Sequence, residues 1–117
     1  MEIRSEQIGA VTVLTVDGAL TVDHGVANLA SVIRESMATG RSRLVLDLSA
    51  VEFMDSLGLE ALLTANTTAE KCGGRLALTS LKPRLKRLIE ITRIGEILET
   101  HEDRAAAVDS LLGTAAS

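Results

Sequence analysis

Apolar residues follow a period of two in several short segments of the chain, which is the spacing of a β-strand with one buried face. The segment Val11–Asp17 alternates in this way and is rich in β-branched residues, so we expect a strand there. Residues 44–48 and 76–79 are almost continuously apolar, which is typical of strands inside a sheet. Residues 3–8 show a weaker strand pattern, and Gly9 is placed to turn this strand back onto the next one as a hairpin.

Between these strands the apolar spacing changes to that of a helix with one buried side. It predicts a first helix over residues 23–37, which Gly40 ends, and a second helix whose apolar stripe covers residues 59–69. Pro83 favours the first turn of a third helix, and Gly95 is the residue expected to end it.

The C-terminal part of the chain has the signals of one more strand and one more helix. Residues 97–100 are expected to form a short last strand. Thr100 followed by Asp103 has the spacing of a capping box, which opens a final helix that runs through Leu112. Residues 113–117 are expected to fray, as chain ends without packing partners do.

The order of these elements predicts the fold class. After the first hairpin, strands alternate with helices, and a helix is the usual crossover between parallel strands. We therefore predict a single α/β domain over residues 1–117, with a mixed, mostly parallel sheet of four to five strands and about four helices.

Composition excludes several classes of function. The aromatic share is 1%, which is Phe53 alone, so the core is aliphatic and the chain cannot stack single-stranded nucleic acid on aromatic rings. The net charge of −4 argues against binding a polyanion, so no direct contact with nucleic acid is expected. No apolar run approaches the ~18 residues that span a membrane, and the first residues lack a signal-peptide pattern. We expect a cytoplasmic protein without a membrane span.

The segment from strand to helix around residue 56 carries the candidate chemistry. Ser56 stands where the turn meets the second helix, so its hydroxyl is either an exposed phosphate acceptor near the positive helix end or a helix N-cap. Asp55 either orients that hydroxyl, contacts a partner or caps the helix itself. Gly58 permits a close backbone approach at the first turn, or tight packing on a strand.

Residues 53–59 read Phe-Met-Asp-Ser-Leu-Gly-Leu, which resembles the D-S-[ST]-G-[LI] motif of the bacterial anti-sigma factor antagonists, a group of STAS domain proteins. The strand at residues 44–48, Gly18, the Gly73–Gly74 pair and residues 81–88 also fall where that family has them. The resemblance covers roughly residues 3–112 and implies the STAS fold.

The resemblance also implies a function. In that family, the serine after the aspartate is phosphorylated by an anti-sigma factor that is itself an ATP-dependent serine kinase. By position the acceptor is Ser56, with Asp55 beside it. The unphosphorylated protein would bind the kinase and so free a sigma factor, and a phosphatase would reset phosphorylated Ser56. No catalytic activity of its own is expected.

The partner surface implied by the resemblance includes more than the serine. Thr21 and Asp23 lie in the turn where the family has a functional acidic residue, although Asp23 could instead cap the following helix. Leu57 departs from the family, which has a second hydroxyl residue there, and replaces a polar group with apolar surface. The expected partner-binding residues are Asp55, Leu57, Gly58, Asp23 and Thr21.

Two other functions remain open. Small STAS proteins also serve as accessory subunits of lipid-transporting ABC systems, and Leu57 would suit a constitutive apolar contact with an ATPase. An enzyme is the other alternative, but the G-x-S-x-G nucleophile elbow of hydrolases is absent. The sequence also has no Walker A or G-x-G-x-x-G pattern, so no cofactor is expected.

Two further groups of residues, the histidines and a basic cluster, are of types that bind metals or anions. His24 and His101 have no companions at the spacing of metal ligands, so we expect both at the surface and no metal site. A basic cluster lies in and directly before the third predicted helix. It is either a solvated helix face or a contact for an acidic patch or a nucleotide phosphate, and its members are Lys82, Arg84, Lys86, Arg87 and Arg93.

Overall fold

The computed structural model describes residues 2–21, 23 and 25–116 of the chain. Within these residues the chain forms five strands, four α-helices and one short 3-10 helix. In chain order they are β1 (Glu2–Ile8), β2 (Val11–Asp17), α1 (Val26–Ala38), β3 (Arg43–Ala50), α2 (Ser56–Lys71), β4 (Arg75–Thr79), α3 (Pro83–Ile91), η1 (Ile94–Glu96), β5 (Glu99–His101) and α4 (Arg104–Ala116).

The strands form one sheet in the order β1-β2-β3-β4-β5. β1 is antiparallel to β2 and joins it through a turn at Gly9, whose φ of +58° suits glycine. The remaining neighbours are parallel, with a helix in each of the first two crossovers. The predicted mixed, mostly parallel sheet of a single α/β domain is confirmed.

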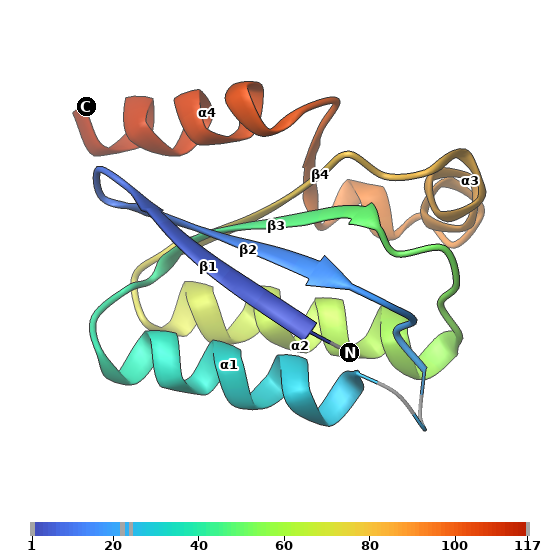
Figure 1. The fold of residues 1–117 in the computed structure, drawn as a ribbon. Coiled ribbons are helices and arrows are strands. Elements are labelled where there is room, and N and C mark those ends of the chain that lie inside the picture. The colour runs from blue at the N-terminus through green and yellow to red at the C-terminus, as the bar shows by residue number, and fades with distance from the viewer. Residues whose placement is uncertain (1, 22, 24, 117) are drawn as a thin grey trace.

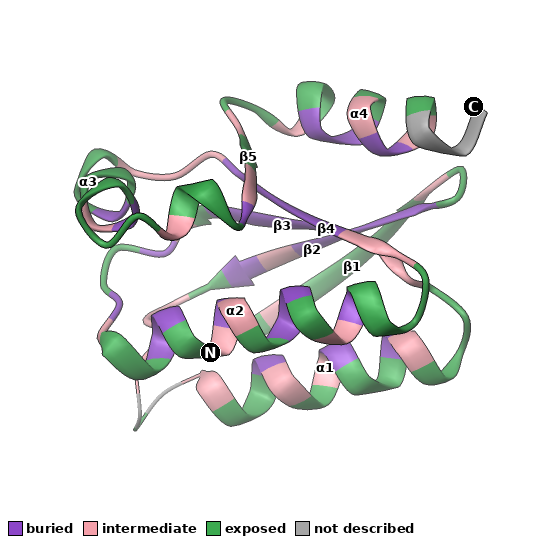
Figure 2. Cartoon of the chain, turned by 180° about the vertical axis from the view of Figure 1, so that it is seen from behind, coloured by how far each residue is buried: buried purple, intermediate pink, exposed green. Residues whose placement is uncertain are grey.

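The sheet is covered by helices on both faces. Figure 1 shows α1 and α2 side by side on one face and α4 on the other. β3 lies in the middle of the sheet, and its alternating side chains therefore enter two separate cores. Leu44, Leu46 and Leu48 join the larger core under α1 and α2, and Val45 joins the smaller core under α4. Figure 2 shows the resulting buried layer between the sheet and the helices.

The strand order also decides where the loops lie. β2, β3, β4 and β5 follow one another in one direction, so the order never reverses and the sheet lacks the crevice of a doubly wound nucleotide-binding fold. The loops that follow β2, β3 and β4 instead lie together at the carboxyl end of the sheet, beside the first turn of α2 and near α3 (Figure 1). This end of the molecule holds Ser56, the first residue of α2.

Helix α4 is held to the sheet by an ion-pair network as well as by its small apolar core. The Arg104 guanidinium donates to Asp47 Oδ2 at 2.9 Å, to Thr15 Oγ1 at 3.0 Å and to Glu6 Oε1 at 3.1 Å. Burial works to raise the pKa of Asp47, but the Ser49 backbone amide and Arg104 bond to its carboxylate and hold the pKa below its ordinary value. The charged form of Asp47 is therefore stabilised by the fold.

A second polar network joins α4 to the other edge of the sheet. The Glu99 carboxylate on β5 bonds to Arg75 of β4, to His101 Nε2 at 2.6 Å and to Ser110 Oγ at 2.8 Å. Burial opposes ionisation of Glu99, but these hydrogen bonds lower its pKa overall. His101, which we expected at the surface, is instead half-buried, with its ring against Glu99.

Several predicted boundaries were wrong, each for a local reason. α3 ends at Ile91, before Gly95, because Arg93 adopts a left-handed φ of 62°. Thr100 does not cap the last helix, since it lies in β5. Asp103 is the capping residue, and its Oδ1 accepts a 2.8 Å bond from the Ala106 amide. Fraying of residues 113–117 stays a prediction, since α4 is assigned through Ala116 and Ser117 lies outside the described residues.

The Arg104 network predicts an effect of Asp47→Asn on stability. The variant loses a charge-assisted hydrogen bond in a buried place, so its free energy of unfolding at pH 7 should fall by about 1–3 kcal/mol. Because the folded-state pKa of Asp47 is lowered, this contribution is complete above the ordinary value near 4 and is lost as the pH falls through the lower folded value.

Denaturant unfolding followed by circular dichroism at pH 7 and at pH 3 measures both effects. Glu6→Gln is the matched control, since Glu6 is an exposed partner of the same arginine and its loss should cost under about 1 kcal/mol. An equal loss in both variants, or a difference that does not shrink in acid, would contradict the expected role of Asp47.

Candidate functional site

Ser56 is exposed at the start of α2, and Asp55 rather than Ser56 is the N-cap of this helix. The Asp55 backbone is extended, with φ −100° and ψ −175°, and its Oδ1 accepts a 2.9 Å bond from the Gly58 amide. Of the open interpretations, capping by Asp55 is confirmed and capping by Ser56 is wrong. The Ser56 hydroxyl therefore stands in solvent at the positive end of a 16-residue helix.

The first turn of α2 lies directly on the backbone that follows β2. A Cβ atom on Gly58 would lie 2.2 Å from the Leu20 carbonyl oxygen and 2.6 Å from Met54 Cγ, closer than any real contact allows. Around this point the Leu20 amide donates to the Phe53 carbonyl at 3.0 Å, and the Asp55 amide donates to the Leu20 carbonyl at 3.2 Å. Gly58 is thus the residue that lets two loops meet beside Ser56.

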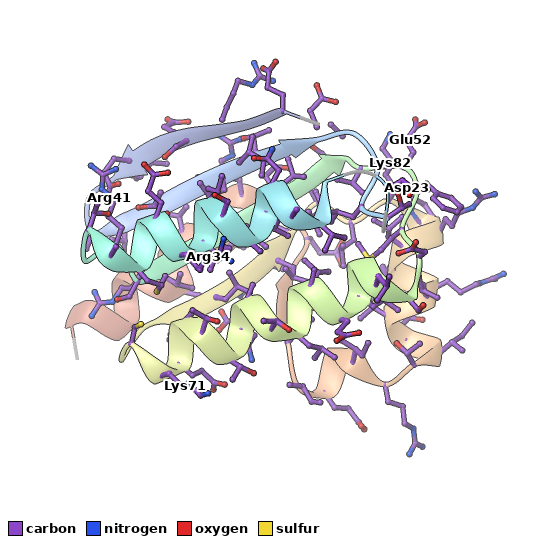
Figure 3. All side chains as sticks on the ribbon, turned by 90° about the horizontal axis from the view of Figure 1, so that it is seen from below. Asp23, Arg34, Arg41, Glu52, Lys71 and Lys82 are labelled. Carbon is purple, nitrogen blue, oxygen red and sulfur yellow. The ribbon has the colours of Figure 1, made fainter. Side chains whose placement is uncertain are left out.

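The loop that carries Thr21 and Asp23 belongs to this meeting point. Thr21 is half-buried and forms a bridge with Gly25, which is the N-cap of α1. Gly25 has a left-handed φ of 83° and α1 has no side-chain cap bond, so the interpretation of Asp23 as a cap is wrong. The Asp23 side chain is exposed instead, at the same end of the molecule as Glu52 and Lys82 (Figure 3).

Large apolar side chains are exposed on both sides of Ser56. Leu57 is 41% exposed and lies on a groove between α1 and α2, whereas Leu59 is only 7% exposed and belongs to the core. The expectation that Leu57 is more exposed than Leu59 is confirmed. Phe53 is 53% exposed in the loop before Ser56 and was not expected at the site. The one signal in the sequence was the presence of an aromatic residue two positions before Asp55.

The basic cluster divides into paired and unpaired cations. Lys82 pairs with Glu52 at 3.0 Å, and Lys86 pairs with Glu102 at 3.0 Å, which raises the pKa of Lys86. Arg84 and Arg87 are exposed and have no ion pair with any described residue. The cluster is therefore a solvated helix face in part, and Arg84 and Arg87, like the exposed Arg93, have no ion pair with a described residue.

Among the described residues, no three His, Cys, Asp or Glu side chains lie together as a metal site would need. His24 lies outside the part that the structure describes, and His101 is engaged with Glu99. No described helix combines the length and the apolar character that crossing a bilayer requires.

Comparison with known proteins assigns the chain and its fold to a family. A model of the STAS domain family matches residues 2–107, and the chain therefore belongs to the STAS domain family. The chain is similar to an anti-sigma F factor antagonist of Paenibacillus polymyxa, with 24% identity over 113 residues that cover 95% of both chains.

Solved structures agree with this assignment. The fold matches an anti-sigma factor antagonist from Mycobacterium paratuberculosis with a TM-score of 0.83 and 25% identity, covering 94% of this chain and 92% of the other. It matches the unphosphorylated anti-sigma factor antagonist SpoIIAA with a TM-score of 0.73 and 19% identity, covering 96% and 99% of the two chains. The predicted STAS fold is confirmed.

The close approach at Gly58 predicts that Gly58→Ala destabilises the domain. The added methyl group cannot fit against the Leu20 carbonyl oxygen, so the loop or the helix must move, at a cost of about 1–3 kcal/mol or more. Gly113→Ala is the matched control, because a Cβ there meets nothing within 4 Å, and the helix should gain up to about 1 kcal/mol. Thermal melts by circular dichroism compare the two, and a Gly58→Ala melt equal to wild type would contradict the contact.

Proposed function

We propose that this protein is an anti-sigma factor antagonist whose partner binding is switched by phosphorylation of Ser56. In the unphosphorylated state it binds an anti-sigma factor with serine kinase activity and so frees a sigma factor. Phosphate on Ser56 releases that partner, and a phosphatase restores binding. The observation that carries the proposal is an exposed serine directly after the cap of α2, in a chain whose relatives are named anti-sigma factor antagonists.

The local physics supports a switch in the complex rather than in the fold. Phosphate adds about −1.5 to −2 charges, and a helix N-terminus stabilises negative charge by roughly 0.3–1 kcal/mol. The Ser56 side chain is not part of either core, so the domain can accept the group. At the interface, two added charges about 6 Å from a partner carboxylate, at an effective dielectric near 40, repel by roughly 2–3 kcal/mol.

The surrounding residues support a protein partner and no chemistry of the domain's own. Asp23, Leu57 and Phe53 are exposed around Ser56, and together they combine a carboxylate with apolar area. A buried centre of apolar contacts within a polar rim is typical of protein interfaces. We propose Thr21, Asp55 and Gly58 as parts of the same surface because they fix the two loops on which it is built.

The exposure of Leu57 also supports a second candidate function. An accessory subunit of a lipid-transporting ABC system would bind its ATPase constitutively, and an apolar side chain next to Ser56 suits such a contact. The two candidates differ in their partner. A pull-down followed by mass spectrometry of the partner and of Ser56 separates them, because only the first predicts a serine kinase and a phosphorylated Ser56.

Leu57→Ser is expected to change partner affinity with little effect on the fold. Because Leu57 is exposed, the free energy of unfolding should change by less than about 1 kcal/mol. Leu59→Ser is the control on the buried side of the same turn and should cost several kcal/mol. If Leu57→Ser unfolds the domain as Leu59→Ser does, Leu57 belongs to the core and not to the partner surface.

The switch predicts opposite behaviour for two variants of Ser56. Ser56→Ala should keep binding the kinase and resist phosphorylation. Ser56→Asp should bind more weakly with an unchanged melting temperature, and full phosphorylation should weaken binding by tens-fold to about a hundred-fold. Titration of both variants and the phosphorylated protein against the kinase measures this, with melts followed by circular dichroism because the chain has no Trp or Tyr. Equal affinity of all three forms rules out the switch and favours the ABC subunit.

A further inference from the structure

A second groove includes Phe53, in the loop that leads to Ser56. It runs between the loop that leads into α2 and one side of α3, and it has a volume of about 330 Å³. Phe53 lines it from the loop, and Arg84, Arg87, Leu88 and Ile91 line it from α3. These four residues of α3 are spaced as one helix face, so the groove is a continuous surface of apolar and basic side chains.

The apolar part of this surface is unusually exposed. The described residues include four large apolar side chains that stand in solvent, namely Phe53, Leu57, Ile91 and Ile97. Phe53 and Ile91, at 53% and 72% exposure, both line the groove. The single aromatic residue of the chain therefore contributes nothing to the core, and it lies three positions before Ser56. Gathered exposed apolar side chains mark interaction surfaces.

The charge of the groove is opposite to that of the protein. The chain has a net charge of −4, yet Arg84 and Arg87 both face the groove. The neighbouring lysines of α3 and its preceding loop are paired with Glu52 and Glu102, but these two arginines pair with no described carboxylate. Aromatic residues and arginine are both enriched in protein interfaces.

We propose that this groove binds an acidic segment of the protein partner, with apolar side chains against Phe53 and Ile91 and carboxylates against Arg84 and Arg87. The groove shares Phe53 with the surface around Ser56. The inference rests on the proposed function, because it assigns the same partner to the groove and to that surface. It also explains why phosphate would release that partner. A carboxylate-rich segment beside Ser56 is repelled by the added charge, whereas a neutral or basic segment is not.

Nucleic acid and anionic membranes fit the groove less well. Both are polyanions whose binding depends on broad positive fields, and the whole protein is acidic. The apolar side chains of Phe53 and Ile91 would add nothing to contacts with the phosphate backbone of a nucleic acid. A short amphipathic segment matches two arginines and two apolar positions on one helix face.

The test is charge reversal with a matched control at the other end of the molecule. Arg84→Glu/Arg87→Glu is compared with Arg41→Glu/Lys71→Glu, which changes the net charge equally but lies far from the groove, at the end opposite Asp23 and Lys82 (Figure 3). The kinase identified by the pull-down is titrated against both variants. We expect about a hundred-fold weaker binding for the groove variant and less than about three-fold for the control. Wild-type binding should weaken with salt more than binding of the groove variant.

Two further measurements separate this inference from the proposed function. Ile91→Ser should weaken kinase binding about ten-fold, whereas the same change at Ile97, a similarly exposed isoleucine outside the groove, should not. Phe53→Trp supplies the single tryptophan of the chain, and its emission should shift to the blue when a roughly 15-residue helical peptide of Leu and Glu is added. A peptide in which Lys replaces Glu should cause no shift.

Each outcome decides the inference. If the groove variant and the control bind the kinase equally, the groove is not a docking site, although the Ser56 switch can still hold. If the peptide with Glu gives no shift, or the peptide with Lys gives the same shift, the acidic partner is wrong. If Arg84→Glu/Arg87→Glu abolishes binding to anionic vesicles or to an oligonucleotide and leaves kinase binding intact, the groove serves a polyanion instead.

Discussion

The close approach of α2 to the Leu20 backbone is the constraint on which the rest of the site depends. Gly58 has no side chain, so the first turn of the helix can lie against the Leu20 carbonyl, and the Leu20 amide and carbonyl bond across to Phe53 and Asp55. Two loops from different crossovers are joined by these contacts. Asp23, Phe53 and Ser56 therefore share one end of the sheet.

The helices on the two faces of the sheet are held by different interactions. The face under α1 and α2 is sealed by aliphatic side chains, whereas α4 covers a smaller apolar cluster and relies on carboxylates bound by Arg104 and Arg75. This ionic attachment sits on the opposite side of the sheet from α1 and α2 (Figure 1). Ser56 stands at an exposed helix start outside both cores, which is the position that the proposed switch in binding needs.

The sequence by itself determined the fold. Strand and helix periods, together with glycines and Pro83, predicted a mixed α/β sheet, the central position of residues 44–48 and a helix that begins at the Asp-Ser pair. These features depend on local residue preferences or on the hydrophobic pattern, so they can be predicted from the sequence without knowledge of the tertiary structure. The family motif likewise located Ser56 correctly at the start of α2.

Only the tertiary structure decided how neighbouring residues divide their roles. Asp55, Ser56, Asp23 and Thr100 are all of residue types that favour helix caps. In the structure the caps are Asp55 for α2, Gly25 for α1 and Asp103 for α4, because the direction in which the chain enters each helix decides which residue caps it. An apolar residue in a sequence predicts burial, so the exposure of Phe53 and Ile91 was not foreseeable. Exposure depends on what other segments cover, and in this fold no described segment covers these two side chains, which line the groove between α3 and the loop before α2.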